Sequence, residues 1–412
     1  MAALQREFYC LIAAQFASAL ADNALLLVVI AMLQANGVDA FWIPLLKLLF
    51  TLSYVVCGPW VGSWSDHQPK HAVMMWANGL KLCACASLVI GLDPILAFAF
   101  TGLGAAIYAP AKYGLITEMV KADQLVHANA WIEVSAISAA LLGVMLGGAG
   151  VSSPWREWLA STGWRCIFEG PVFVETIALI CCIYLLSALF NVFIPDMGKR
   201  YRVDTWHVKQ VLQNFYQDQC KLWRDPLGGI SLFVTTLLWG VGACMQLLVL
   251  SWAQRMLALS LSQAAYLQAS TAIGVVIGAI LAARHVSLKN APSVLVPGLV
   301  MGATLPLMLW IHQWQWALLL TLGLGVLSGF VVVPMNALLQ ARGVQLLSAG
   351  RSIAVQNTSE NSSILLMLGG YAFLEYAHWP IEHLVFAVAG LIFTGVGHAL
   401  WRYRQLSLST AA

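Results

Sequence analysis

Twelve apolar runs constrain the fold of this chain more than any other feature. Each run has about 20 residues or more, which is the length that an α-helix needs to cross the hydrocarbon core of a bilayer. The runs lie near 8–34, 41–63, 71–91, 94–117, 126–148, 167–194, 227–253, 262–283, 292–312, 315–339, 352–376 and 382–402. Because backbone polar groups must be satisfied internally in lipid, these runs predict an all-α polytopic membrane protein with twelve transmembrane helices.

The longest polar segment separates the runs into six and six. It carries six cations, which are Lys199, Arg200, Arg202, Lys209, Lys221 and Arg224. We therefore expect an N-terminal six-helix bundle over 1–194, a cytoplasmic linker over 195–226 and a C-terminal six-helix bundle over 227–412. Two patterns occur once in each half, a glycine-rich run with proline (102–114 and 323–336) and Met-Leu-Gly-Gly (145–148 and 367–370). Their similar spacing predicts a parallel internal repeat.

Composition excludes several classes of protein. Charged residues make up 9% of the chain, whereas a soluble domain carries about 25%. The net charge of +3 is small and the basic residues form no arm, so we expect no nucleic-acid partner. The sequence contains no nucleotide-binding loop, no metal-ligand spacing and no nucleophile elbow, so we expect neither an enzyme nor a cofactor.

The distribution of cations predicts the orientation. If the N-terminus is cytoplasmic, the outer segments hold Arg156, Arg165 and Arg255, and nearly all other cations outside the runs fall on the inner side. Basic residues collect in cytoplasmic segments of membrane proteins. We therefore expect both termini and the linker to be cytoplasmic.

Several charges lie inside the predicted spans. Asp22, followed by Asn23, is near the middle of the first run, and Lys81 is about ten residues into the third. A charge at a helix centre costs about 2.5–3.5 kcal/mol on insertion scales, so each one indicates a substrate contact or a structural bond to a neighbouring helix. Lys47 lies near an outer end, where it either has a function or extends to the interface.

Three further charges lie inside the predicted spans. Lys112 and Glu133 have similar depths on consecutive runs, which fits either an ion pair or a lysine offered to an anionic head group. Glu360 lies in the eleventh run among polar side chains, which are Gln356, Asn357, Asn361 and Ser362. So dense a polar run is expected to line a cavity.

Five segments resemble the bacterial lysophospholipid transporter family of the major facilitator superfamily. They are 16–26, 77–82, 110–114, 333–343 and 354–361. The resemblance implies a lipid transporter in the bacterial inner membrane that moves lysophospholipids, such as lysophosphatidylethanolamine and lysophosphatidylglycerol, from the outer to the inner leaflet. There a cytoplasmic acyltransferase/acyl-carrier-protein synthetase, a possible partner, restores the missing chain. The resemblance also implies that Asp22, Lys112 and Glu360 contact the head group.

The chain departs from that family in the seventh run. The family often has an arginine where this sequence has Gln246. Losing that cation weakens the attraction to phosphate, and we hypothesise that Lys47 replaces it. The expected substrate-binding residues are thus Asp22, Asn23, Lys47, Lys81, Lys112, Gln246, Asn357 and Glu360.

The loop after the second run carries a gating motif. It reads Gly62-Ser-Trp-Ser-Asp66-His-Gln-Pro-Lys70, a degenerate form of a pattern common in major facilitator transporters. We expect Gly62, Asp66 and Lys70, together with Glu133, to act in the conformational change. The resemblance implies two bundles that rock about a site between them and give alternating access.

Two other functions remain open. A proton-coupled exporter of amphiphilic drugs would use the same buried carboxylates. A membrane-embedded lipid enzyme, or a scaffold for the acyltransferase, would need the same lipid surroundings. The sequence does not decide the head-group preference or the coupling ion.

Overall fold

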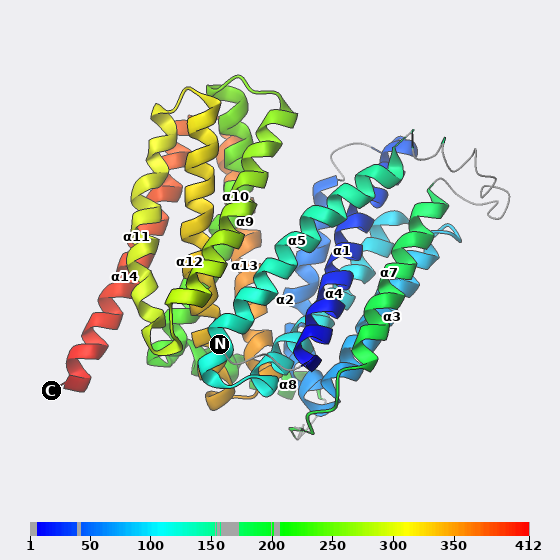
Figure 1. Ribbon diagram of the computed structural model, residues 1–412, viewed down its shortest axis with the longest axis horizontal. Coiled ribbons are helices and arrows are strands. Elements are labelled where there is room, and N and C mark those ends of the chain that lie inside the picture. Colours follow the sequence, from blue (N-terminus) through cyan, green and yellow to red (C-terminus); the bar gives the residue numbers. More distant parts are fainter. Residues whose placement is uncertain are drawn as a thin grey trace. The chain divides into compact units, whose positions relative to one another are not determined.

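Helices make up nearly all of the structure (Figure 1). The computed structural model describes residues 6–38, 43–152, 154, 157, 173–198, 200–201 and 207–411. Some residues on which the sequence predictions rest lie outside these ranges. They are the outer cations Arg156 and Arg165, the linker cations Lys199 and Arg202, and the first residues of the second and sixth runs, 41–42 and 167–172.

The chain forms two compact units. Unit 1 consists of Met1–Met119, Ser135–His207 and Ala349–Ala354, and unit 2 of Val120–Val134, Val208–Ser348 and Val355–Ala412. Two long helices therefore contribute to both units. The division expected from the sequence, with boundaries at 194 and 226, remains a prediction.

The first half of the chain supplies six long helices. They are α1 (Arg6–Ala35), α2 (Ile43–His67), α3 (Lys70–Ser87), α4 (Pro94–Met119), α5 (Leu125–Val151) and α7 (Val174–Val192), with the short 3₁₀ helix η2 (Ala122–Gln124) before α5. Each corresponds to one of the first six predicted spans. In unit 1, α4 packs against α2 and α3, and α7 packs against α1 and α3.

The second half begins with an additional helix, α8 (Val208–Arg224), and continues with six spans. These are α9 (Pro226–Met256), α10 (Leu261–His285), the continuous segment η4 (Leu288–Val294), α11 (Leu295–Thr304) and η5 (Leu305–Trp310), then α12 (Trp314–Leu346), α13 (Ala349–Tyr376) and α14 (Ile381–Ala411). The all-α architecture with twelve spans is thus confirmed. Within the predicted linker, however, the sequence analysis missed the helix α8.

Ten of the described segments are long and apolar enough to cross a membrane. The two other predicted spans are α3 and α13, whose interiors carry Lys81 and Glu360 among other polar side chains. The helices that fall short on hydropathy are therefore two that hold candidate site residues. The protein is a multi-pass membrane protein.

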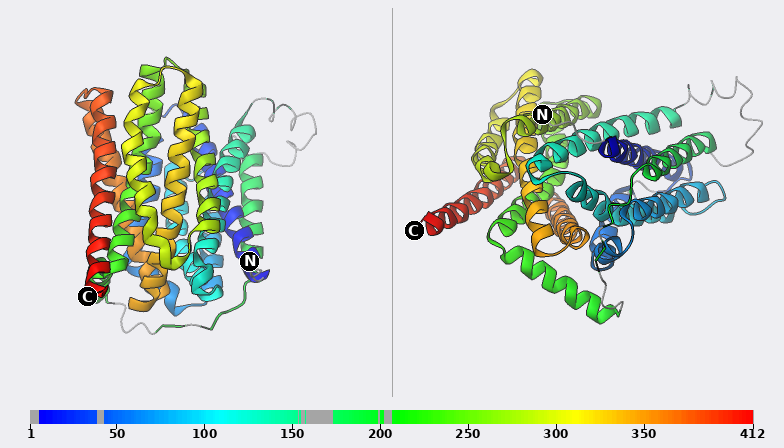
Figure 2. Two further views of the ribbon diagram at one scale, coloured as in Figure 1. Left: turned by 60° about the vertical axis from the view of Figure 1, so that its left-hand side comes forward. Right: turned by 60° about the horizontal axis from the view of Figure 1, so that its bottom comes forward.

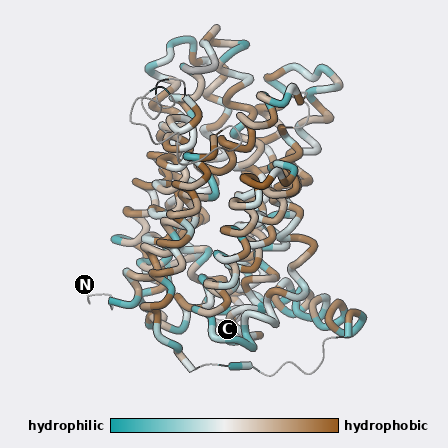
Figure 3. Tube along the Cα trace, turned by 90° about the vertical axis from the view of Figure 1, so that its right-hand side faces the viewer, coloured by the Kyte–Doolittle hydropathy of each residue, from teal (hydrophilic) through white to brown (hydrophobic). Residues whose placement is uncertain are grey.

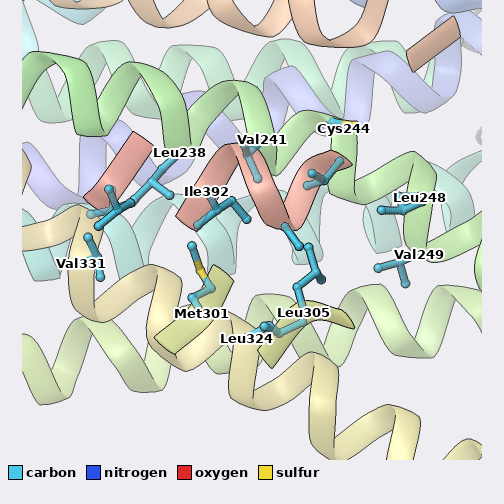
Figure 4. Close-up of a cluster of buried hydrophobic side chains, with 14 of the residues drawn as sticks. Leu238, Val241, Cys244, Leu248, Val249, Met301, Leu305, Leu324, Val331 and Ile392 are labelled. Atoms are coloured by element: carbon cyan, nitrogen blue, oxygen red, sulfur yellow. The ribbon is translucent and has the colours of Figure 1, made fainter. Parts of the chain in front are cut away.

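The core of unit 2 is a continuous cluster of apolar side chains from α9, α11, η5, α12 and α14 (Figure 4). Leu238, Val241 and Leu248 of α9 are almost fully buried and belong to one cluster with Met301 and Ile392. Unit 1 has a corresponding cluster around Leu25 and Val28 of α1 and Ile177 and Ile180 of α7. The close packing of small and large side chains holds each bundle together in a solvent that is itself apolar.

The tightest helix contact in unit 2 joins α10 and α12, which lie side by side (Figure 1). Each helix presents a pair of glycines four residues apart, Gly274 and Gly278 on α10 and Gly325 and Gly329 on α12. A Cβ atom added at any of the four would overlap a carbonyl oxygen of the opposite helix. Glycine at both pairs lets the two backbones touch. At Gly323, the first residue of the glycine-rich run in α12, an added Cβ atom would have open space around it.

Asp225 fixes the start of α9. Its Oδ1 accepts the backbone N–H of Gly228 at 2.7 Å, and its two oxygens accept Nε and Nη2 of Arg342 at 3.1 and 2.6 Å. Burial opposes ionisation of this carboxyl group. Hydrogen bonds from Arg342 and Gly228 outweigh that effect and hold the pKa of Asp225 below its ordinary value. The residue thus serves both as an N-cap and as half of a bidentate ion pair.

The close contact between α10 and α12 predicts that the loss of stability depends on which glycine of α12 is replaced. Gly325→Ala should destabilise the protein by about 1–3 kcal/mol, because the new methyl group forces α10 and α12 apart. Gly323→Ala, two residues away on the same helix, should leave stability unchanged or slightly higher, since alanine favours helix over glycine. Thermal unfolding of the purified variants in detergent measures both. Equal effects at the two positions would contradict the close contact.

The lowered pKa of Asp225 predicts a dependence on pH. A carboxyl group whose pKa is lower in the folded state contributes stability above its unfolded pKa, about 4, and loses it as the pH falls. Asp225→Asn should therefore be less stable than the parent by about 1.5–3 kcal/mol at pH 7, and the gap should narrow below pH ~4. Asp196→Asn, which breaks the exposed pair with Arg200, is the control and should change stability little. A gap that stays constant with pH would show that the charge of Asp225 is unimportant.

Candidate functional site

Asp22 and Lys81 form a buried ion pair inside unit 1. Asp22 lies in α1 and Lys81 in α3, and Lys81 Nζ is 2.6 Å from Asp22 Oδ2. The Lys81 side chain is 2% exposed and that of Asp22 is 14% exposed. The structure therefore brings together two charges that the sequence predicted separately, and the less buried member is the carboxylate.

Neighbouring polar groups complete this ion pair. The hydroxyl of Tyr184 on α7 donates to Asp22 Oδ1 at 2.7 Å, and Lys81 Nζ also donates to Ser18 Oγ at 3.0 Å. From Ser18 the chain of hydrogen bonds continues to Asn78 Oδ1 at 2.9 Å, and from Asn78 Nδ2 to Ser187 Oγ at 2.8 Å. Three helices are thereby joined at the level of the pair. Removing one ion would leave the other charged and uncompensated in a site of low dielectric constant.

Glu360 occupies a different environment in unit 2. It lies in α13, is 6% exposed, and accepts a hydrogen bond from Gln356 Nε2 at 2.8 Å. The same nitrogen of Gln356 donates to Asn336 Oδ1 of α12 at 3.0 Å. Gln356 therefore links the carboxyl group of Glu360 to the neighbouring helix through a neutral amide.

Two further polar residues, Asn357 and Asn361, lie within one turn of Glu360 on α13. The carbonyl of Asn357 accepts Asn361 Nδ2 at 2.8 Å, while Asn357 Nδ2 is buried with no hydrogen-bond partner among the described residues. Gln246 is exposed on α9, and its carbonyl accepts Gln268 Nε2 at 2.7 Å. Asn357, three residues before Glu360, thus has a side-chain donor with no partner among the described residues. Gln246, by contrast, is exposed.

The gating motif forms a contact in unit 1 between the end of α2 and the start of α13. Asp66, 1% exposed, accepts the backbone N–H groups of Gly350 at 2.9 Å and Arg351 at 3.1 Å. These groups belong to the first turn of α13, where N–H groups have no partner within the helix. A Cβ atom on Gly62 would lie 2.7 Å from that of Ala354, so glycine permits this approach. Asp66 stands in the last turn of its own helix, α2.

Lys70 joins the same contact from the first residue of α3. Its Nζ is 2.7 Å from Glu118 Oε1 of α4 and 3.8 Å from Asp66 Oδ1. It also lies 5.8 Å from the ring centre of Tyr201. Glu118 was not singled out from the sequence. It directly follows the fourth run, and this position could have indicated an acidic partner for Lys70.

The other predicted site residues are spread over both units. Asn23 donates to the carbonyl of Ala19 within α1 at 2.8 Å, and Lys47 is exposed near the start of α2. Lys112 Nζ lies 4.1 Å from the ring centre of Tyr113 on α4. Glu133 is half-buried on α5 in unit 2, whereas Lys112 is in unit 1. Both alternatives given for them from the sequence, an ion pair or a lysine offered to an anionic head group, remain predictions.

A reciprocal amide pair in unit 2 was missed from the sequence. Asn129 Nδ2 of α5 donates to Gln340 Oε1 at 2.9 Å, and Gln340 Nε2 of α12 donates to Asn129 Oδ1 at 2.8 Å. Both residues are buried. Within the part of the chain that the structure describes, no cluster of three or more histidine, cysteine or acidic side chains is placed to hold a metal ion.

Comparison with protein families identifies the class of this protein. The family model described as Major Facilitator Superfamily matches residues 11–368. Two solved structures share the fold: a bacterial homologue of the iron transporter ferroportin (TM-score 0.72, 15% identity, 98% of this chain and 100% of that one) and the fucose transporter FucP (TM-score 0.70, 16% identity, 96% and 98%). These similarities concern architecture alone.

Sequence relatives narrow the family. The chain is 37% identical over 399 residues to the lysophospholipid transporter LplT of Citrobacter koseri, covering 96% of this chain and 95% of that protein. It is 36% identical over 381 residues to LplT of Yersinia enterocolitica, covering 92% and 89%. The chain therefore belongs to the Major Facilitator Superfamily and, within it, to the family of these lysophospholipid transporters.

The buried pair predicts a strongly non-additive double-mutant cycle. Lys81→Met should cost about 3–5 kcal/mol of stability, because Asp22 is left as an isolated buried charge. Asp22→Asn should be costly for the converse reason. The double variant Asp22→Asn/Lys81→Met should lose much less than the sum, since no unpaired charge remains. Unfolding of the four proteins in one detergent tests this, and additive effects would rule out direct coupling.

Proposed function

We propose that this protein moves lysophospholipids across the bacterial inner membrane, from the outer to the inner leaflet, without changing them chemically. The observation that carries the proposal is 37% identity over almost the whole chain to a transporter of that name. The buried charges of both units are consistent with it. The family is one of transporters, and the function requires no catalytic residue.

The substrate's head group has the chemistry that these charges suit. A lysophosphatidylethanolamine carries a phosphate anion and an ammonium cation, and lysophosphatidylglycerol carries the phosphate alone. Asp22 and Glu360 are proposed to meet the amine, and Lys112 and Lys81 the phosphate, by charge-assisted hydrogen bonds. Asn23, Asn357 and Gln246 are proposed as neutral donors and acceptors nearby. The single acyl chain stays in the lipid, so that only the head group needs a polar path.

The Asp22–Lys81 pair supports exchange of partners as the binding mechanism. In the structure each ion neutralises the other at 2.6 Å. A zwitterionic head group brings one charge of each sign, so it can insert between the two ions while every buried charge keeps a partner. Asp22, the more exposed of the two, is the natural first contact. Such an exchange avoids the cost of stranding a charge in the membrane interior.

The orientation in the membrane and a functional partner are part of the same proposal. We propose that both termini lie in the cytoplasm, as the cation distribution predicts. Lysophospholipid delivered to the inner leaflet is then available to a cytoplasmic acyltransferase/acyl-carrier-protein synthetase, which we propose as a functional partner. Gly62, Asp66, Lys70 and Glu133 are proposed to act in alternating access. The contact of Asp66 with the first turn of α13 supports a role for this motif in one conformational state.

Uptake of labelled lysophosphatidylethanolamine into spheroplasts that lack a native activity tests the proposal. Asp22→Ala and Glu360→Ala should each lower uptake at least tenfold, because a lost charge-assisted contact is worth about 1.5–3 kcal/mol. Lys47→Ala should also lower uptake if Lys47 compensates for Gln246. Asp196→Ala, which removes an exposed carboxylate, is the matched control and should leave uptake unchanged.

Membrane expression of every variant is measured alongside uptake. A wild-type protein that moves no lysolipid would overturn the proposed substrate and favour an exporter of amphiphilic drugs. Normal uptake by Asp22→Ala and Glu360→Ala would overturn the proposed site but would not count against the proposed substrate. Normal uptake by Lys47→Ala would remove Lys47 from the site.

A further inference from the structure

The helix α8 has an apolar face that the rest of the described structure does not cover. Val211 and Leu222 on one side of α8 are buried, and Leu222 belongs to a cluster with Leu232 of α9 and Leu339 of α12. Beside them runs a second apolar stripe of Val208, Leu212 and Tyr216, which are 60%, 45% and 69% exposed. These residues are spaced by four, so they lie one above another on a single strip of the helix. We call them the outer stripe.

The opposite face of α8 is polar. Gln210, Gln213 and Gln217 are exposed there, and the helix also carries three cations, Lys209, Lys221 and Arg224, against one acidic residue, Asp218, which is buried. A helix with an apolar strip, a polar face and an excess of cations is typical of segments that lie in a membrane interface.

Two membrane spans lie next to α8. The helix ends at Arg224, and the membrane span α9 begins at Pro226. Lys221 Nζ donates to the carbonyl of Leu346 at the end of the span α12, at 2.5 Å. Trp223 is half-buried against the apolar cluster of Leu222, Leu232, Leu339 and Val355, and its indole N–H donates to Gln219 Oε1 at 3.1 Å. Figure 3 shows that hydrophobic residues, in brown, recur along the long helices, and α8 is the lowest green helix in the right-hand view of Figure 2.

We propose that α8 is an interfacial helix whose outer stripe inserts into the bilayer surface, with anionic lipid head groups as its ligands. Val208, Leu212 and the ring of Tyr216 enter the boundary between head groups and acyl chains, a depth that aromatic rings with a polar end favour. Lys209 and Arg224 attract anionic phosphates, as basic residues near a charged membrane surface do. If water alone surrounded the outer stripe, three large apolar side chains would stay solvated although lipid lies nearby. This inference depends on the membrane location of the chain and is independent of the substrate.

Spin labels placed around the full-length protein's α8 in liposomes test the proposal. Single cysteines replace Leu212 and Tyr216 on the outer stripe, and Gln213 and Gln217 on the opposite face, in a background whose nine native cysteines are replaced. Collision with oxygen, which partitions into lipid, is compared with collision with a water-soluble nickel chelate. In liposomes that contain phosphatidylglycerol, positions 212 and 216 should favour oxygen severalfold over positions 213 and 217. The contrast should shrink in pure phosphatidylcholine.

Each other outcome counts against the proposal. Free access of the nickel chelate to all four positions would mean that the outer stripe faces water. Low access of both reagents to 212 and 216 would mean that protein covers the stripe, either another part of this chain or a cytoplasmic partner. An equal contrast in neutral and anionic liposomes would overturn the role of the cations. Hydrogen exchange of α8 in the unmodified protein, which should be slower in anionic than in neutral nanodiscs, gives the same test without cysteine replacement.

Discussion

The cost of holding charge inside a membrane organises this structure. Lys81 is almost fully buried, and the 2.6 Å contact with Asp22 makes its position tolerable. That contact in turn depends on Tyr184, Ser18 and the hydrogen bonds that extend from them across three helices. In a solvent with no hydrophobic force between helices, such polar links and close backbone contacts determine how the helices pack.

The two units deal with this cost in different ways. Unit 1 compensates a carboxylate with a cation, whereas Glu360 in unit 2 is held by the amide of Gln356, which also reaches Asn336. The first arrangement neutralises each charge with the other. The second places an acidic group beside a neutral amide, where a cation would be a stronger partner. The head-group contacts proposed above rest on these two arrangements.

Much of the fold was predictable from the sequence because span length and hydropathy are one-dimensional properties. The depth of Asp22 and Lys81 was predictable for the same reason. Their pairing was not, since it depends on the rotation of α1 and α3 about their axes. Tyr184 and Glu118 were missed because either side chain is ordinary at its position until the neighbouring helix is placed. For α8 a signal was present: Val208, Val211, Leu212, Phe215 and Tyr216 recur with a helical period inside a segment interpreted as a polar linker.

The most direct test of the central claim is whether the purified protein alone moves a lysophospholipid between leaflets. Labelled lysophosphatidylethanolamine is added to the outer leaflet of liposomes that contain the wild-type protein, and the fraction that albumin can still extract is followed with time. The account predicts that lipid becomes protected from albumin faster than in empty liposomes and that its mass stays unchanged. Lipid that remains extractable, or that is recovered with an altered mass, would contradict it.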